Sequence, residues 1–105
     1  MNPARIEQLK EMIQENPADS FCQYALALEY ASDPSAQKQA IEELEKLRMN
    51  DPNYLALYYQ LGLLYHQQKE KELAKQVLIE GQALAKKQGN THTYSELEFL
   101  LEDLD

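Results

Sequence analysis

The residue types that most often carry catalysis or bind metals are few and scattered in this 105-residue chain. The two histidines, His66 and His92, stand alone, without the His-x-x-x-His or Cys-x-x-Cys spacing that suits zinc. The acidic runs at residues 42–45 and 102–105 lack the glycine and the alternating oxygen ligands of a calcium loop. No glycine-rich phosphate loop and no nucleophile elbow is present. We therefore expect no enzyme activity, no cofactor and no bound metal.

The single cysteine, Cys22, indicates packing rather than reactivity. It lies in a segment that is apolar around most of a helical circumference, where a thiol behaves as a small hydrophobic group. A reactive thiol is the less favoured alternative. One cysteine cannot form an internal disulfide, which fits a reducing cytoplasm. The first residues carry no secretory signal, and no stretch approaches 18 apolar residues, so we expect a soluble cytoplasmic protein.

The net charge of −8 argues against nucleic acid as a partner, because phosphate backbones would be repelled. The charge is uneven along the chain, at −1 for residues 1–17, −4 for 18–52, +2 for 53–89 and −5 for 90–105. The acidic last segment either lies against the lysines of residues 53–89 or faces solvent. Solvation is favoured, since exposed ion pairs contribute only about 0–1 kcal/mol each.

The hydrophobic spacing predicts six helices and no strand. Prolines and glycine separate them, at Asn16-Pro17, at Asp33-Pro34, at residues 51–52 and at Gly89-Asn90. Asp33 is the expected N-cap of the third helix, and the fourth is expected over residues 53–67. The sequence Thr93-Tyr94-Ser95-Glu96 has the form of a capping box, so the last helix is expected to begin there.

A set of residues recurs about 35 positions along the chain. Each copy has a leucine, a small residue and a tyrosine in one helix, then an alanine and a leucine in the next. Such recurrence is typical of helix pairs that stack on one another. The first copy, which closes with Pro52, and the second, which begins at Tyr58, are as follows: Leu26, Ala27, Tyr30, Ala40, Leu44; and Leu61, Gly62, Tyr65, Ala74, Leu78.

This pattern resembles the tetratricopeptide repeat, a helix-turn-helix unit of about 34 residues with the form W-x-x-L-G-x-x-Y…A-x-x-x-F…P. Tyr58 stands in place of the tryptophan, Gln23 stands there in the first unit, and Lys86 replaces the second closing proline. The resemblance implies an all-α superhelix in a single domain covering residues 1–105. Its parts would be an N-terminal half-unit or cap helix at 1–17, repeats at 18–52 and 53–89, and a C-terminal capping helix at 90–105.

In this family the first helix of each unit lines a concave groove that accepts a peptide or a partner's helix. Carried over to this chain, the resemblance implies a non-catalytic protein–protein interaction module or scaffold, whose partner is a segment of another protein. That face carries almost no charge, so a clamp for a C-terminal carboxylate is not expected. The implied groove residues are Phe21, Tyr24, Leu28, Tyr59, Leu63 and His66.

Two alternatives to this groove remain open. The last helix can instead fold back and bury Tyr24, Tyr59 and Leu63 as core. The same apolar face, or an open repeat end, can pair with a second copy of the chain and make a structural homo-oligomer.

Overall fold

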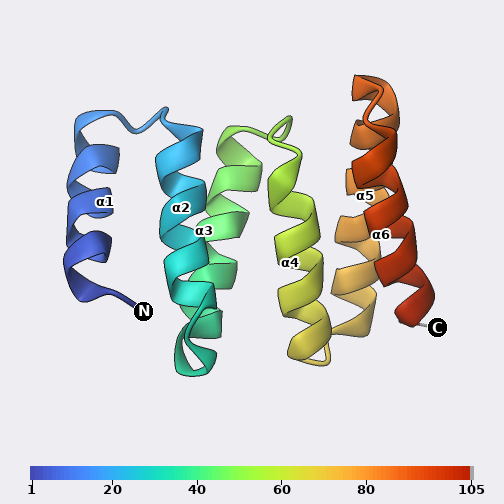
Figure 1. Cartoon of the computed structure of the whole chain (residues 1–105), viewed down its shortest axis with the longest axis horizontal. Helices are drawn as coiled ribbons and strands as arrows, with labels where there is room; N and C mark the ends of the chain where they lie inside the picture. The colour runs from blue at the N-terminus through green and yellow to red at the C-terminus, as the bar shows by residue number, and fades with distance from the viewer. Residues whose placement is uncertain (105) are drawn as a thin grey trace. The chain divides into compact units, whose positions relative to one another are not determined.

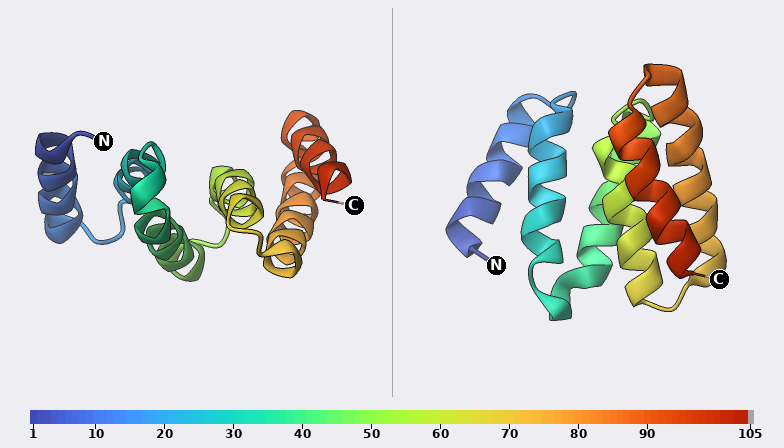
Figure 2. Two further views of the ribbon diagram at one scale, coloured as in Figure 1. Left: turned by 90° about the horizontal axis from the view of Figure 1, so that it is seen from below. Right: turned by 45° about the vertical axis from the view of Figure 1, so that its right-hand side comes forward.

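The computed structural model describes residues 1–104 and consists of helices joined by short turns (Figure 1). Within the described residues there is no strand. The predicted all-α class with six α-helices is therefore confirmed, with one short 3₁₀ helix in addition; Figure 2 shows two further views. The elements are α1 Pro3–Glu15, α2 Ser20–Ala31, η1 Pro34–Ala36, α3 Gln37–Asn50, α4 Ala56–Gln67, α5 Lys71–Gln88 and α6 Thr91–Asp103.

The chain divides into two compact units, which are described separately below. Unit 1 spans Met1–Tyr54 and holds α1, η1, α2 and α3, and unit 2 begins at Leu55 and holds α4, α5 and α6. The repeat boundaries that the sequence suggests, at residues 18, 53 and 90, remain a prediction.

Local side chains define the first two helices. Asn2 caps α1, its side-chain oxygen accepting a 3.2 Å hydrogen bond from the Arg5 amide, and Pro3 takes a position where no amide hydrogen is needed. Asp19 caps α2 in the same way, accepting from the Cys22 amide at 3.1 Å. Both helices therefore begin where the sequence supplies a short polar side chain just ahead of an apolar run.

The start of α6 differs from the prediction. The capping box at Thr93–Glu96 is wrong as the beginning of this helix, because Thr93 already lies inside it. Instead Asn90 caps α6, its side-chain oxygen accepting from the Thr93 amide at 2.9 Å. Gly89 ends α5 with a φ of 71°, so the chain turns at once and the next residue is free to cap the following helix.

Two other helix starts also differ from the prediction. Asp33 caps η1 rather than α3, since its carboxylate accepts from the Ser35 amide at 2.9 Å, and α3 begins at Gln37 without a side-chain cap. Helix α4 begins at Ala56 rather than at residue 53, because the preceding residues form a turn closed by a hydrogen bond to a backbone carbonyl.

The core of unit 1 is formed where α2 packs against α3 on one side and against α1 on the other. Helix α1 contributes Ile6 and Leu9, which lie in one cluster with Cys22, Ala25 and Leu26 of α2. From α3, Ala40, Leu44 and Leu47 are fully buried.

The core of unit 2 is formed by α5, which packs against both α4 and α6. Fully buried leucines come from all three helices: Leu57 and Leu61 from α4, Leu78 from α5 and Leu97 from α6. Of the twelve residues that define the repeat pattern, all are buried except Tyr30, which is half-buried, and Pro52, which is exposed.

Candidate functional site

In unit 1, three predicted groove residues share one side of α2. Phe21, Tyr24 and Leu28 are spaced three and four residues apart, so their side chains follow one helical face. They line a surface hollow of about 330 Å³ together with Ala25 and three polar residues, and we call this set the α2 surface. Phe21 is 68% exposed at its edge. The polar residues are Arg5, Glu29 and Ser32.

The α2 surface is held by contacts to its neighbours in unit 1. The Tyr24 ring lies 5.3 Å from the Tyr54 ring, centroid to centroid, with the planes inclined at 49°. Arg5 of α1 forms a 3.1 Å ion pair with Glu29 of α2, so the charged groups at this hollow neutralise each other. Burial, followed by the nearby carboxylates, chiefly Asp51, raises the pKa of the Tyr54 phenol above its ordinary value of 10.0. Tyr54 therefore stays neutral at physiological pH.

Unit 2 carries a second aromatic surface, between α4 and α6. Tyr59 of α4 and four residues of α6 line a hollow of about 350 Å³, and we call this set the α4–α6 surface. Phe99 is the most exposed of these aromatic residues, at 77%. The other residues from α6 are His92, Ser95 and Glu96.

His66, the last predicted groove residue, lies beside a different hollow of unit 2. This hollow has a volume of about 220 Å³ and is also lined by Lys69, Lys71 and Leu104. The His66 Nε2 atom is 3.5 Å from an Asp103 carboxylate oxygen, so the end of α4 meets the end of α6. The two groups attract each other when the imidazole is protonated.

The structure thus brings three predicted groove residues together in unit 1 and distributes the others over unit 2. Helix α6 packs against α5 and also contacts α4. Tyr59 and Leu63 of α4 nevertheless remain half-buried, with part of each side chain accessible.

Among the residues that sequence reasoning missed, Phe99 and Arg5 line these surfaces and Tyr54 packs against Tyr24. Phe99 falls outside the leucine stripe of the last helix, and that periodicity alone would have placed it on an outer face. Tyr54 lies in a turn, where helical spacing gives no information about its neighbours. Arg5 was visible only as a charge near the start of the chain, without its partner Glu29.

The described residues show little that is suited to chemistry. Residues 1–104 hold no group of histidine, cysteine or acidic side chains that could bind a metal ion. Cys22 is 3% exposed, and its Sγ donates to an Asp19 carboxylate oxygen at 3.2 Å. Burial first, and then Asp19, raises the pKa of this thiol, which disfavours the reactive thiolate. In the same part of the chain, no helix has both the length and the apolar character needed to span a membrane.

Comparison with known proteins identifies the fold family. No family model matches the sequence, and no curated protein matches it. Among solved structures, the tetratricopeptide repeat domain protein of Salinibacter ruber is similar at 30% sequence identity with a TM-score of 0.78. The match covers 86% of this chain and 90% of that one. The chain belongs to the tetratricopeptide repeat family. The resemblance that the sequence suggested is therefore confirmed.

Two further structures share the tetratricopeptide repeat fold with this chain. The TPR2B domain of yeast Sti1, solved as a complex with pHsp70, has a TM-score of 0.86 at 21% identity, covering 94% of this chain and 78% of that one. A protein from Bordetella parapertussis has a TM-score of 0.80 at 24% identity, covering 94% and 85%. At these identities the likeness concerns the fold alone.

Proposed function

We propose that this tetratricopeptide repeat protein binds a segment of another protein and acts as a non-catalytic interaction module in the cytoplasm. The observation that carries the proposal is the exposure of Phe21 beside the hollow of the α2 surface. An aromatic side chain that stands in solvent next to a concave apolar surface is typical of a binding site. Family membership and the pHsp70 complex of the related fold in Sti1 agree with a role in protein binding.

The α2 surface favours a ligand that is recognised through apolar contacts. Phe21, Tyr24 and Leu28 offer an aromatic and aliphatic strip along one side of α2, and Tyr24 adds a hydroxyl group to it. A peptide with one or two large apolar side chains, or one face of a partner's helix, fits such a strip. An interface of this small size binds on the order of micromolar, about −8 kcal/mol.

A free C-terminal carboxylate is not the ligand that we propose. The one cation lining the α2 hollow is Arg5, and it is already paired with Glu29 at 3.1 Å. A carboxylate would have to break that pair and would then meet the unpaired Glu29. This unfavourable exchange supports an uncharged ligand segment at the α2 surface.

The α4–α6 surface is a second contact site in the proposal. Phe99 and Tyr59 supply its apolar area, while Glu96 and His92, whose side chains are 3.5 Å apart, supply its polar rim. Aromatic residues within a polar rim are the usual composition of a protein-binding surface. Leu63 and His66 lie on α4 in the same unit, and we propose that they contribute to this contact site, with His66 held 3.5 Å from Asp103 of α6.

Substitution of the most exposed aromatic residues tests the proposal one unit at a time. Phe21→Glu places a charge on the α2 surface and Phe99→Glu places one on the α4–α6 surface, while neither removes a buried group. Met49→Glu is the matched control, because Met49 is 86% exposed on α3 and lines neither surface. The tagged wild type and the three variants would be used to capture partners from a native lysate, after circular dichroism has shown equal helicity.

The expected result is a protein that the wild type and Met49→Glu hold equally and that Phe21→Glu or Phe99→Glu loses. Titration of the captured protein's binding segment would then show a loss of affinity of about tenfold or more for that variant. Equal capture by all four proteins, or no capture at all, would contradict the proposal. A loss with only one of the two variants would identify which unit makes the contact.

A further inference from the structure

In unit 2, helices α5 and α6 carry two residue stripes that lie side by side. Each stripe repeats every three or four residues and therefore follows one side of its helix. The side-chain amide of Gln82 donates a 2.8 Å hydrogen bond to the Glu98 carboxylate, which joins the stripes at their middle. We call the two stripes together the α5–α6 face. Its residues are Lys71, Lys75, Ile79, Gln82 and Lys86 from α5, and Thr91, Tyr94, Glu98, Leu101 and Glu102 from α6.

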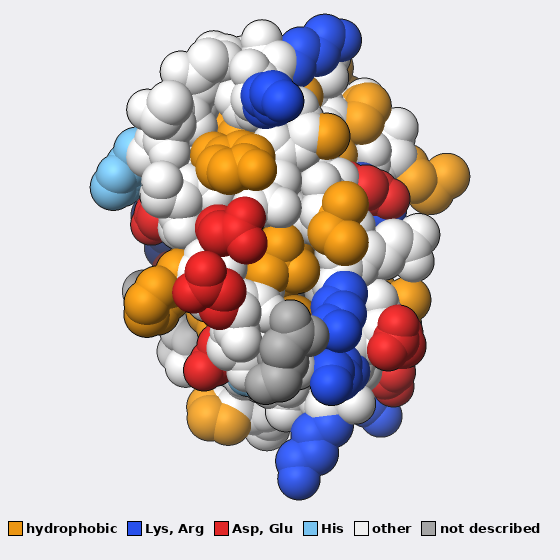
Figure 3. Space-filling view, turned by 90° about the vertical axis from the view of Figure 1, so that its right-hand side faces the viewer, with side chains coloured by type: hydrophobic (Ala, Val, Ile, Leu, Met, Phe, Trp, Pro, Cys, Tyr) orange, Lys and Arg blue, Asp and Glu red, His pale blue; other side chains and the backbone are white. Residues whose placement is uncertain are grey.

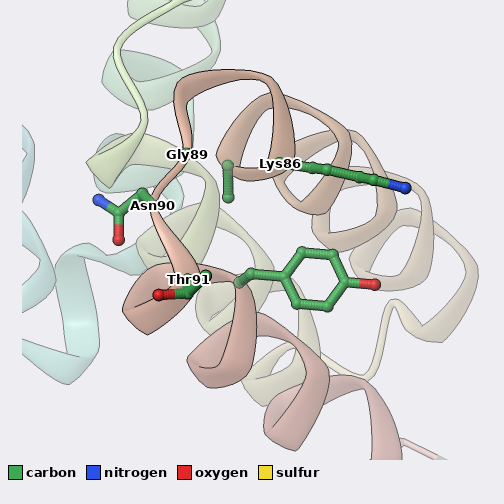
Figure 4. A pocket seen from close by; sticks show the side chains of 6 residues that line it. Lys86, Gly89, Asn90 and Thr91 are labelled. Carbon is green, nitrogen blue, oxygen red and sulfur yellow. The ribbon is translucent and has the colours of Figure 1, made fainter.

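The two ends of the α5–α6 face are also defined by contacts. At the turn between the helices, a hollow of about 250 Å³ is lined by Lys86 and Tyr94, together with the turn residues and Ala85 (Figure 4). At the opposite end, Lys71 of α5 lines a hollow with Leu104, the residue that follows α6. The two stripes are thus neighbours along their whole length.

Accessible apolar side chains lie on both sides of the Gln82–Glu98 hydrogen bond on this face. Ile79, which is 57% exposed, and Leu101, which is half-buried, each lie three residues from this bond toward the Lys71 end, and Tyr94, which is 38% exposed, lies toward the turn. None of these side chains is needed to fill the core of unit 2, which the leucines of α4, α5 and α6 already occupy. Large apolar groups that remain accessible next to one another indicate a surface for association.

The charges on the α5–α6 face are segregated by helix. The α5 stripe carries three lysines, with Glu72 at its edge, and the α6 stripe carries two glutamates. Figure 3 shows this side of the molecule, where hydrophobic side chains lie near the centre, one group of acidic side chains lies to their left, and lysines lie to the lower right with further acidic side chains beside them at the edge. A surface with one sign on each side of an apolar centre is complementary to itself after a half-turn about an axis parallel to the helices.

We infer that unit 2 pairs with a second copy of this chain through the α5–α6 face. A two-fold axis along the helices places α5 of one copy against α6 of the other, running antiparallel, in a four-helix arrangement. Lys71 then faces Glu102 of the other copy, and Lys86 faces the ring of Tyr94, where a cation and an aromatic ring attract each other. Ile79 and Leu101 of both copies meet at the centre.

Charge complementarity selects a second copy as the occupant. A different protein would need an acidic group opposite Lys71, a basic group opposite Glu102 and an apolar ridge between them. This chain carries all three at the required spacing on its own α5–α6 face. The inference is independent of the proposed function, since the α2 surface takes no part in it and Phe99 lies outside both stripes.

The first test is the mass of the chain in solution as a function of concentration. Sedimentation equilibrium from about 1 μM to about 500 μM should show the 12.2 kDa chain approaching twice that mass. Ile79→Glu should raise the dissociation constant at least tenfold, because it buries two negative charges, one from each copy, within the apolar contact of the pair. Met49→Glu in unit 1 is the control and should leave the dimer unchanged.

Reversing the charge of Lys71 or of Glu102 distinguishes a loss of this pairing from a general loss of structure. Lys71→Glu and Glu102→Lys each place two like charges opposite each other and should weaken self-association. An equimolar mixture of the two variants should regain the dimer as a heterodimer, since both contacts then join opposite charges. Neither change harms its helix, because an acid is favourable in the first turn of α5 and a base in the last turn of α6.

Three results would overturn the inference. A wild type that stays at one chain mass throughout this concentration range forms no such pair. A dimer that Ile79→Glu leaves intact uses another surface. Single variants that lose the dimer without regaining it in the mixture show that Lys71 and Glu102 do not face each other.

Discussion

A Cβ atom on Gly81 of α5 would stand 2.6 Å from the Cβ of Tyr58 in α4. Gly81 therefore lets α5 and α4 of unit 2 cross at a distance that no other residue permits without a shift of the backbone. Gly62 of α4 has the corresponding role toward Leu78, but there the nearest atoms belong to the end of a side chain. A side chain added at Gly81 would therefore require a shift of the helix backbones, whereas one added at Gly62 would require only the Leu78 side chain to move.

Gly81→Ala should lower the free energy of unfolding by about 1–3 kcal/mol, as overpacking of a tight core does. This loss should exceed the gain of about 1 kcal/mol in helix propensity that alanine normally brings. Gly62→Ala should lose less, since the end of the Leu78 side chain can rotate away. Urea unfolding followed by circular dichroism measures both. A Gly81→Ala variant more stable than the wild type would show that the helices separate easily.

Gly89→Ala should destabilise the chain for a different reason. Gly89 has a φ of 71° and no atom within 4 Å of an added Cβ, so the effect of a side chain is confined to the backbone. A left-handed conformation costs a non-glycine residue about 1–2 kcal/mol, and asparagine tolerates it better than alanine. The order of melting temperatures should be wild type, then Gly89→Asn, then Gly89→Ala. Equal melting temperatures for the two variants would contradict this account.

Helical periodicity predicted the fold well, because one helix face must be apolar wherever two helices pack. The buried state of Leu61 and Leu78, for example, follows from spacing within each helix alone. The close approach of α5 to α4 at Gly81 does not follow from this spacing, since it depends on where Tyr58 of α4 contacts α5. The start of α6 was misplaced for a related reason: Asn90 and Thr93 both have capping side chains, and only the turn at residue 89 decides between them.

The candidate site was predictable in part. The strip of Phe21, Tyr24 and Leu28 follows from spacing on one helix, and the structure places all three around one hollow. The neighbours that complete each surface come from other helices. Phe99 beside Tyr59 could not be paired with it from the sequence, because no local pattern records how α6 lies along α4.

The hydrogen bond between Ser20 and Asp51 should stabilise unit 1. The Ser20 hydroxyl donates to an Asp51 carboxylate oxygen at 2.6 Å, and so ties the first residue of α2 to the residue that follows α3. Hydrogen bonds to charged groups contribute about 1.5–3 kcal/mol, so we expect Ser20→Ala to lose about that amount or somewhat less at this partly buried site.

A double-mutant cycle isolates the contribution of this bond. Ser20→Ala and Asp51→Ala each remove one partner, and the double variant removes both. Residues in direct contact show an interaction energy of about 0.5–3 kcal/mol. Additive losses in urea unfolding would mean that Ser20 and Asp51 act independently.

The cap of α2 should make the stability of unit 1 depend on pH. The hydrogen bonds from the Cys22 amide and then from its thiol hold the pKa of the Asp19 carboxyl below its ordinary value of 3.8. Because the unfolded chain takes up this proton first as the pH falls, the ionised cap stabilises the folded state above pH 3.8. That contribution disappears as the pH falls through the lower pKa of the folded state.

Asp19→Asn isolates the charge at this position, because asparagine caps a helix nearly as well as aspartate but does not ionise. The wild type should be the more stable of the two at pH 7, where the carboxylate also meets the positive end of α2. The difference should shrink once the pH falls below 3.8, as the wild-type carboxyl becomes protonated. Urea unfolding of both proteins at a series of pH values from neutral downward measures it. A difference that stays constant with pH would show that the hydrogen bonds of Asp19, and not its charge, stabilise α2.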